Sequence, residues 1–124
     1  MHKAVLLLAL MAVWPAARAA ELPQSVMQEI EQLLGALGSS GCRFYRNGSW
    51  YGAADAQANL TKKYEYLRKK KLIEKAEDFI AKGGTESSKS GKPYQVQCGQ
   101  EGAVESAAWL QAALRRLRDG ASPR

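Results

Sequence analysis

The spacing of apolar residues along the chain predicts four helices. In residues 23–37, 53–70 and 106–118, apolar side chains recur every three or four positions with polar side chains between them. This period places the apolar residues on one face of a helix, which can then pack against a core. A shorter segment with the same spacing lies within residues 74–82.

Individual residues predict where these helices end. Gly38 follows the first apolar stripe and Gly83-Gly84 follows the third, and glycine is typical of the position just beyond a helix. Continuing the second stripe would bring the charged Lys71 into the core. We therefore expect the second helix to end just before Lys71.

Two short segments alternate instead, which is typical of strands. Residues 42–46 and 94–98 place every second side chain on the same face. After the first of them comes Asn47-Gly48, the dipeptide that best supplies the two positive φ angles of a tight hairpin turn. We expect a second strand beyond this turn, and no internal repeat divides the chain.

The start of the chain has the order of a secretory signal peptide. Lys3 is followed by the apolar run "AVLLLALMAVW" and then by small residues. This run is shorter than the roughly 20 residues that cross a bilayer. We expect residues 1–19 to be removed before Ala20, and no later segment is apolar enough to span a membrane. The product is then a secreted or periplasmic soluble protein.

The remaining residues 20–124 have the length of one small domain, with a frayed tail at residues 119–124. Loss of Lys3 and Arg18 with the leader lowers the formal net charge from +6 to +4. So small an excess does not favour nucleic acid as a partner.

The cysteines favour one disulfide. Cys42 and Cys98 are the only two, and an even number without metal-type spacing in an exported chain is typical of a bridge. The bridge requires the two strands to be antiparallel, since a parallel pair would hold the sulfurs about 13 Å apart. The pairs would be Cys42 with Cys98, Phe44 with Val96, and Arg46 with Tyr94. The predicted fold class is α+β, with four helices on one side of a small antiparallel sheet.

No catalytic chemistry is evident in the sequence. The single histidine, His2, lies in the leader, which excludes Ser-His and Cys-His mechanisms and imidazole metal sites from the mature chain. The stretch "SSKSGKPY" lacks the first glycine of a phosphate-binding loop, where Glu86 stands, and Pro93 follows its lysine. We expect no enzyme activity, no cofactor and no metal.

Basic and aromatic residues have structural explanations as well as functional ones. Seven cations between Lys62 and Lys75 spread round a helix and are most simply a solvated face, although they would allow peripheral contact with an anionic surface. The aromatic residues are expected mainly in the core and at its rim.

Two motifs form the candidate binding face, for an unidentified protein or glycan of the cell envelope. If Arg46 lies across from Tyr94, the hairpin "RNGSWY" and the loop "SSKSGKPY" are neighbours. The competing explanation is that both motifs only form turns, because their residue types are also those that turns prefer. The residues of the face are Arg46, Asn47, Trp50, Tyr51, Ser88, Ser90, Lys92 and Tyr94.

The ordered motifs "RNGSWY", "SSKSGKPY" and Trp109-Leu110 resemble those of a family of small exported bacterial proteins of unknown function. The resemblance extends over nearly the whole mature chain and implies the compartment and the fold, because no activity is established for that family. Asn59 departs from it, since histidine is expected at that position.

Two further functions remain as alternatives. The segment 90–94 is similar to the S-G-x-x-Y pattern of periplasmic lysozyme inhibitors, which insert a loop into the active-site cleft of lysozyme. A small envelope enzyme would instead need a pocket that encloses Lys92, Arg46 and a carboxylate such as Asp55.

Overall fold

A computed structural model of the chain describes residues 21–120. The predicted leader, its cleavage before Ala20 and the last four residues of the predicted tail lie outside this range. The described part forms four helices and four strands. In chain order they are α1 (Gln24–Gly38), β1 (Arg43–Arg46), β2 (Ser49–Tyr51), α2 (Ala53–Lys69), α3 (Ala76–Gly83), β3 (Gln95–Gln97), β4 (Val104–Glu105) and α4 (Ser106–Arg118).

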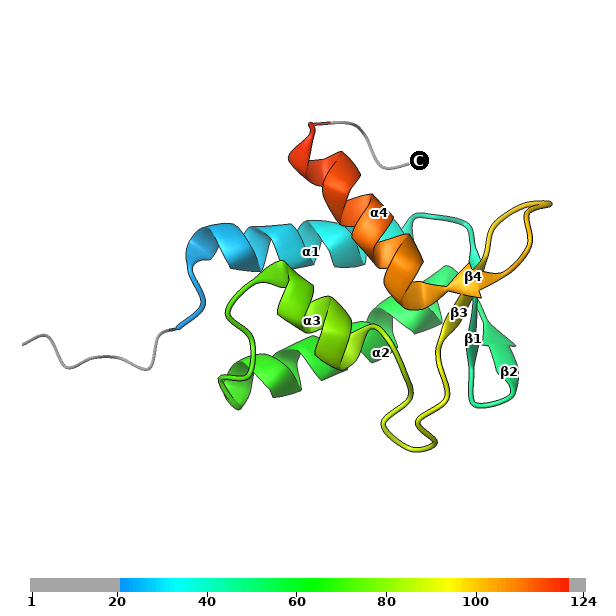
Figure 1. Cartoon of the computed structure of the whole chain (residues 1–124), viewed down its shortest axis with the longest axis horizontal. Coiled ribbons are helices and arrows are strands. Elements are labelled where there is room, and N and C mark those ends of the chain that lie inside the picture. Colours follow the sequence, from blue (N-terminus) through cyan, green and yellow to red (C-terminus); the bar gives the residue numbers. More distant parts are fainter. Residues whose placement is uncertain (1–20, 121–124) are drawn as a thin grey trace, which may run out of the picture.

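The strands form one antiparallel sheet at one end of the molecule, and the helices lie beside it (Figure 1). Its strand order is β2-β1-β3-β4. On β1, Phe44 is buried, whereas its neighbour Arg43 is exposed, so one face of the sheet meets the helices. The predicted α+β class, with four helices and a small antiparallel sheet, is confirmed.

The core forms where the apolar stripes of the helices meet. Ile30, Leu33 and Leu37 of α1 are fully buried, and so are Phe79 of α3 and Leu110 of α4. Their spacing of three or four residues is the one that the sequence pattern requires for a single helical face. The sheet contributes Phe44, whose ring meets Trp109 of α4 edge to face with centroids 6.1 Å apart.

The hairpin between β1 and β2 is closed by the predicted turn. Asn47 has φ of 50° and Gly48 has φ of 86°, the two positive angles for which this dipeptide is favoured. The turn fixes the register at Arg46 opposite Ser49 and Tyr45 opposite Trp50. Side chains at Tyr45 and Trp50 therefore share the face of the sheet that lies away from the helices.

The disulfide and the strand register agree with the sequence prediction. Cys42 and Cys98 are bonded, with Cα atoms 4.4 Å apart, and Phe44 pairs with Val96 between antiparallel β1 and β3. The ladder of β3 is shorter than predicted, since Tyr94 and Cys98 lie just outside it.

Strand β4 was not predicted. It has two residues, both exposed, so it carries no alternation that a sequence pattern could reveal. It pairs Val104 with Val96 and thereby brings the start of α4 to the sheet.

The boundaries of α3 differ from the prediction by about a residue or two, for a local reason. Asp78 accepts backbone hydrogen bonds from Glu74 (2.9 Å) and Lys75 (3.1 Å), which holds these two residues outside the helix as its cap. The helix therefore begins at Ala76.

Loss of the disulfide should destabilise the fold strongly. The bridge joins residues 56 positions apart, and a loop of that length corresponds to about 4 kcal/mol of chain entropy. We expect the double variant Cys42→Ala/Cys98→Ala to lose several kcal/mol in the free energy of unfolding, measured with denaturant. An unchanged midpoint would contradict this.

Helix α2 ends in a backbone geometry that usually selects glycine. Lys71 has φ of 57°, and the amides of Leu72 and Lys71 donate to the carbonyls of Leu67 and Arg68, both at 3.0 Å. This is the Schellman arrangement, in which a residue with a Cβ is strained at the position of Lys71.

Replacing that lysine by glycine should therefore stabilise the protein. We expect Lys71→Gly to raise the free energy of unfolding by roughly 0.5–1 kcal/mol, because the strain is relieved. The matched control Lys69→Gly, within the last turn of α2, should lower it by up to about 1 kcal/mol. Urea denaturation compares the two variants. A lower free energy of unfolding in Lys71→Gly would show that the backbone at position 71 is not strained.

Arg118 joins the end of α4 to two other helices. Its guanidinium donates to Glu29 of α1 at 2.9 Å and to Glu77 of α3 at 2.8 Å. The hydrogen bond from Arg118 lowers the pKa of Glu77 to about 2 and also lowers the pKa of Glu29.

These shifts predict acid sensitivity. A carboxylate with a lowered folded-state pKa stabilises the fold above its ordinary pKa and loses this contribution as pH falls toward the folded value. Both groups are partly exposed, so we expect Arg118→Gln to cost only about 1 kcal/mol at pH 7. The difference from wild type should shrink between pH 4.5 and about 2. Arg115→Gln, which removes an exposed charge, is the control; a pH-independent difference would contradict the assignment.

Candidate functional site

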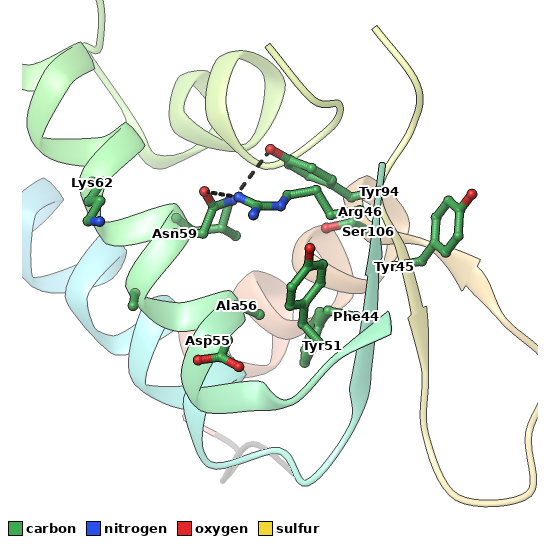
Figure 2. Close-up of a pocket in the computed structure, with 12 residues that line it drawn as sticks. Phe44, Tyr45, Arg46, Tyr51, Asp55, Ala56, Asn59, Lys62, Tyr94 and Ser106 are labelled. Atoms are coloured by element: carbon green, nitrogen blue, oxygen red, sulfur yellow. Dashed lines mark hydrogen bonds between the residues drawn. The ribbon is translucent and has the colours of Figure 1, made fainter. Parts of the chain in front are cut away.

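A pocket of about 400 Å³ lies between the β1–β2 hairpin, the first half of α2 and the start of α4 (Figure 2). This volume is in the range of small-molecule sites. Its lining combines apolar, aromatic and charged side chains. The lining residues are Phe44, Tyr45, Arg46, Tyr51, Asp55, Ala56, Ala58, Asn59, Leu60, Lys62, Tyr94 and Ser106.

Strand and helix periods bring the polar residues together. On β1, Arg46 follows the buried Phe44 by two positions and so shares its face of the sheet. On α2, Asp55, Asn59 and Lys62 are spaced by four and three residues, which places them along one edge of the helix. The hydrogen bond between Arg46 and Asn59 shows that this edge faces β1 at Asn59.

Arg46 is held in the pocket without an acidic partner. Its Nη1 donates to Asn59 Oδ1 at 2.6 Å, and its guanidinium lies 5.0 Å from the ring centre of Tyr51. Among residues 21–120, Arg118 is the cation that forms ion pairs, and Arg46 forms none. Since a guanidinium has five donors, most of those on Arg46 remain available.

Asn59 connects Arg46 to the other side of the pocket. Its Nδ2 lies 3.5 Å from the hydroxyl of Tyr94, a long hydrogen bond, and Lys63 Nζ donates to the same hydroxyl at 3.2 Å. Lys63 also donates to the carbonyl of Glu86 at 2.9 Å. Figure 2 shows Arg46, Asn59 and Tyr94 together, with Asp55 nearer the start of α2.

Ser106 is a buried polar residue of the pocket. It is the first residue of α4 and is 1% exposed, yet it lines the cavity. Its backbone N–H donates to the carbonyl of Tyr94 at 2.9 Å. Its hydroxyl is not among the fully buried side-chain atoms without a hydrogen-bond partner in residues 21–120, which are Tyr64 Oη and Arg116 Nε.

The structure divides the predicted binding face. Arg46, Tyr51 and Tyr94 line the pocket, whereas Trp50 lies 39% exposed on the other face of the sheet, against Tyr45. The exposed aromatic residues Trp50 and Tyr66 also show that the expected core placement holds for only part of the aromatic set.

Asn47 and the "SSKSGKPY" loop form the rim beside the hairpin. Ser90 Oγ donates to Asn47 Oδ1 at 2.6 Å, which joins two segments 43 residues apart. The exposed Ser88 and Lys92 do not line the pocket. The loop is closed internally, since the amide of Gly91 donates to the carbonyl of Ser87 at 2.9 Å.

Sequence reasoning missed Ser106 and Lys62 as pocket residues and assigned Asn59 no contact. The spacing of Asp55, Asn59 and Lys62 on one helical edge was a usable signal. Ser106 gave none, because a serine at the start of a helix is ordinary and its position depends on β4, which was not predicted.

The basic residues at the far end of α2 form a separate exposed group. Arg68, Lys69 and Lys71 border a second cavity of about 240 Å³, together with Leu22. All three cations are exposed, as expected for a solvated face. Contact of this group with an anionic surface stays a prediction.

The described residues offer neither a cluster of metal ligands nor a membrane-spanning helix. Residues 21–120 contain no group of three or more His, Cys, Asp or Glu side chains placed to hold a metal ion. Over the same range, no helix combines the length and hydrophobicity needed to cross a membrane.

Fold and pocket together define a small, disulfide-bonded α+β protein with a polar cavity between a hairpin and a helix. The chain belongs to a family of unknown function, DUF5329, whose model matches residues 24–118. This confirms the resemblance to a family of unknown function. Searches of curated proteins and of solved structures found no match to this chain. Asn59, where the resemblance implied histidine, lies at the centre of the pocket network.

The bond between Arg46 and Asn59 should be measurable as a coupling energy. In a double-mutant cycle with Arg46→Ala and Asn59→Ala, we expect a coupling of about 1.5 kcal/mol in unfolding free energy, because the donor is charged. In a control cycle, Arg46→Ala and Thr61→Ala should be additive, since Thr61 bonds within its own helix. Additivity in the first cycle would show that the pair does not interact.

Proposed function

We propose that this protein is a non-enzymatic binding module of the cell envelope, and that the pocket and its rim are its binding site. The observation that carries the proposal is the half-buried Arg46, which faces a 400 Å³ pocket and has no carboxylate partner within residues 21–120. Removing a charge from water is unfavourable unless it is compensated, and a ligand would compensate this one.

The rim supports a binding role because two distant segments meet there. The bond between Ser90 and Asn47 places the loop beside the hairpin turn, next to the strand that carries Arg46. Turn chemistry explains the two turns separately. It does not require a hydrogen bond between them, whereas a shared binding surface benefits from one.

The disulfide supports the envelope as the compartment. Bridges such as Cys42–Cys98 persist in oxidising surroundings, among them the bacterial periplasm, and are rare in the cytosol. The leader predicted at residues 1–19 is consistent with export to that compartment.

The chemistry of the lining favours binding over catalysis. Ser106 is the serine of the lining, and the hydrogen bond of Arg46, a basic residue of the same lining, goes to Asn59 rather than to this serine. A serine nucleophile needs a base hydrogen-bonded to it as activator. The enzyme hypothesis also required Lys92 in the pocket with Arg46 and Asp55, and Lys92 is not among the lining residues.

Inhibition of lysozyme is the second candidate, and it is favoured by the exposure of the loop. Residues 88–93 are all exposed, and Figure 1 shows the connection from α3 to β3 extending away from the helices. A loop presented in this way could enter a cleft. A lysozyme assay with the mature protein decides this candidate, and absence of inhibition across lysozyme types would end it.

Capture from native periplasm tests the binding function. We expect immobilised mature protein to retain a specific partner or glycan, and Arg46→Ala and Lys92→Ala to retain at least fivefold less. Lys69→Ala serves as the control, because it removes an equal charge at the other end of α2. All four proteins should show the same folded circular dichroism.

If Arg46→Ala and Lys92→Ala retain as much of the partner as the control Lys69→Ala does, the proposed site is contradicted. Retention that falls in Lys69→Ala alone would move the binding surface to the basic end of α2.

A further inference from the structure

We infer that the basic end of α2, residues 66–75 with the turn toward α3, docks on the surface of an anionic phospholipid bilayer. The contact is peripheral. Lysine and arginine side chains face the lipid headgroups, and Tyr66 and Leu72 enter the boundary with the acyl chains. This surface is separate from the pocket, so the inference does not depend on the proposed binding function.

The excess charge of the chain is concentrated in this segment. Residues 66–75 contain five lysine or arginine side chains and one glutamate, a formal charge of +4. Residues 20–124 as a whole also have a formal net charge of +4, so the rest of that chain is neutral in sum. Cations gathered in this way attract an anionic surface, whereas the remainder of the molecule is not repelled by it.

The cations surround two exposed hydrophobic side chains. Residues 68–71 are four consecutive cations, and all of them are exposed. Lys70 Nζ lies 6.0 Å from the ring centre of Tyr66, and Lys82 of α3 donates to the carbonyl of Leu72 at 2.7 Å. The apolar and basic groups therefore form one continuous surface at this corner.

The hydrophobic side chains distinguish a bilayer from other anionic partners. Tyr66 is 59% exposed and Leu72 is 45% exposed, whereas the next residue, Ile73, is buried. Single exposed apolar residues are ordinary on protein surfaces, but these two flank a run of four cations. A nucleic acid or an acidic glycan has no acyl chains to receive a leucine. A lipid interface does, and it also favours tyrosine.

The backbone at Lys71 is an independent observation at the same place. Its φ of 57° lies at a helix end where glycine is the least strained residue. The chain nevertheless has a cation at this position, between Lys70 and Leu72. Strained residues that persist are typical of functional surfaces, and a charge that binds headgroups explains this one.

The position of the basic end leaves the pocket accessible during docking. Figure 1 shows the connection from α2 to α3 at the end of the molecule opposite the sheet. Along α2, Lys69 lies about 21 Å beyond the pocket residue Asp55, at 1.5 Å per residue. A molecule that docks through residues 66–75 therefore keeps its pocket in water. Without a bilayer, the basic end is solvated as well.

Sedimentation of the mature protein with lipid vesicles tests the inference. The vesicles contain equal amounts of phosphatidylglycerol and phosphatidylcholine, and vesicles of phosphatidylcholine alone are the neutral comparison. We expect partitioning onto the anionic vesicles to be at least tenfold stronger. Raising the salt from about 0.1 M to about 1 M should remove most of it, because the charges are screened.

Lys71→Gly is the discriminating variant, because its expected effects on binding and stability are opposite. It should weaken partitioning about fivefold, since one cation near the headgroups is lost, while the free energy of unfolding rises. The double variant Lys69→Gln/Lys70→Gln should weaken partitioning at least tenfold. The matched control Lys89→Gln/Arg115→Gln removes two exposed cations elsewhere and should change it by at most about twofold.

Leu72→Ser separates a bilayer from a soluble polyanion. It should weaken partitioning about fivefold, because an apolar side chain no longer enters the acyl boundary, and Leu72→Trp should bind at least as tightly as wild type. Heparin is the probe for a polyanion without acyl chains. Its binding should be weaker than that of the anionic vesicles, and Leu72→Ser should leave it unchanged.

The inference is overturned if anionic and neutral vesicles bind equally, if neither binds, or if Lys69→Gln/Lys70→Gln partitions as the control does. It is also overturned if heparin binds more tightly than the vesicles and Leu72→Ser partitions as wild type, which would assign the basic end to an acidic polymer.

Discussion

The antiparallel pairing of β1 with β3, joined covalently by Cys42 and Cys98, is the constraint on which the rest of the structure depends. It sets Phe44 opposite Val96, and both side chains then close the core under the sheet. A shift of one residue would turn Arg46 to the other face, where it could not meet Asn59. The register therefore determines whether the pocket exists.

One charged group of the pocket, Arg46, has no acidic partner within residues 21–120. A chain optimised for stability alone would pair it with an acidic residue. The proposed binding site uses this group instead, within a frame fixed by the disulfide and the hairpin. Such local departures from stability are typical of functional sites.

Much of the fold could be predicted, because its determinants are local or covalent. The helical stripes, the turn at Asn47-Gly48 and the bridge each follow from short patterns, and together they gave the register of β1 on β3 correctly. The start of α3 was harder to predict from the sequence, since it depends on the hydrogen bonds that Asp78 accepts from preceding amides. Strand β4 left no pattern in its two residues.

The site was predictable only in part, since it is formed by contacts between elements. Arg46 and Tyr94 were expected to be neighbours, and the structure joins them through Asn59, a residue that the sequence marked only as unusual. Trp50 was grouped with them by proximity in sequence, but strand alternation places it on the other face. Ser106 reaches the pocket because β4 positions α4, which no local pattern reveals.

The most direct test of the central claim is to map binding on the protein itself. In a two-dimensional ¹⁵N–¹H NMR titration of labelled protein with unlabelled periplasmic extract, we expect the largest amide shifts to cluster at Arg46, Tyr51, Asn59 and Tyr94. Amides from Lys69 to Lys71, at the other end of α2, should not move. Shifts confined to that basic end, or the absence of any shift with the extract, would contradict the proposed site.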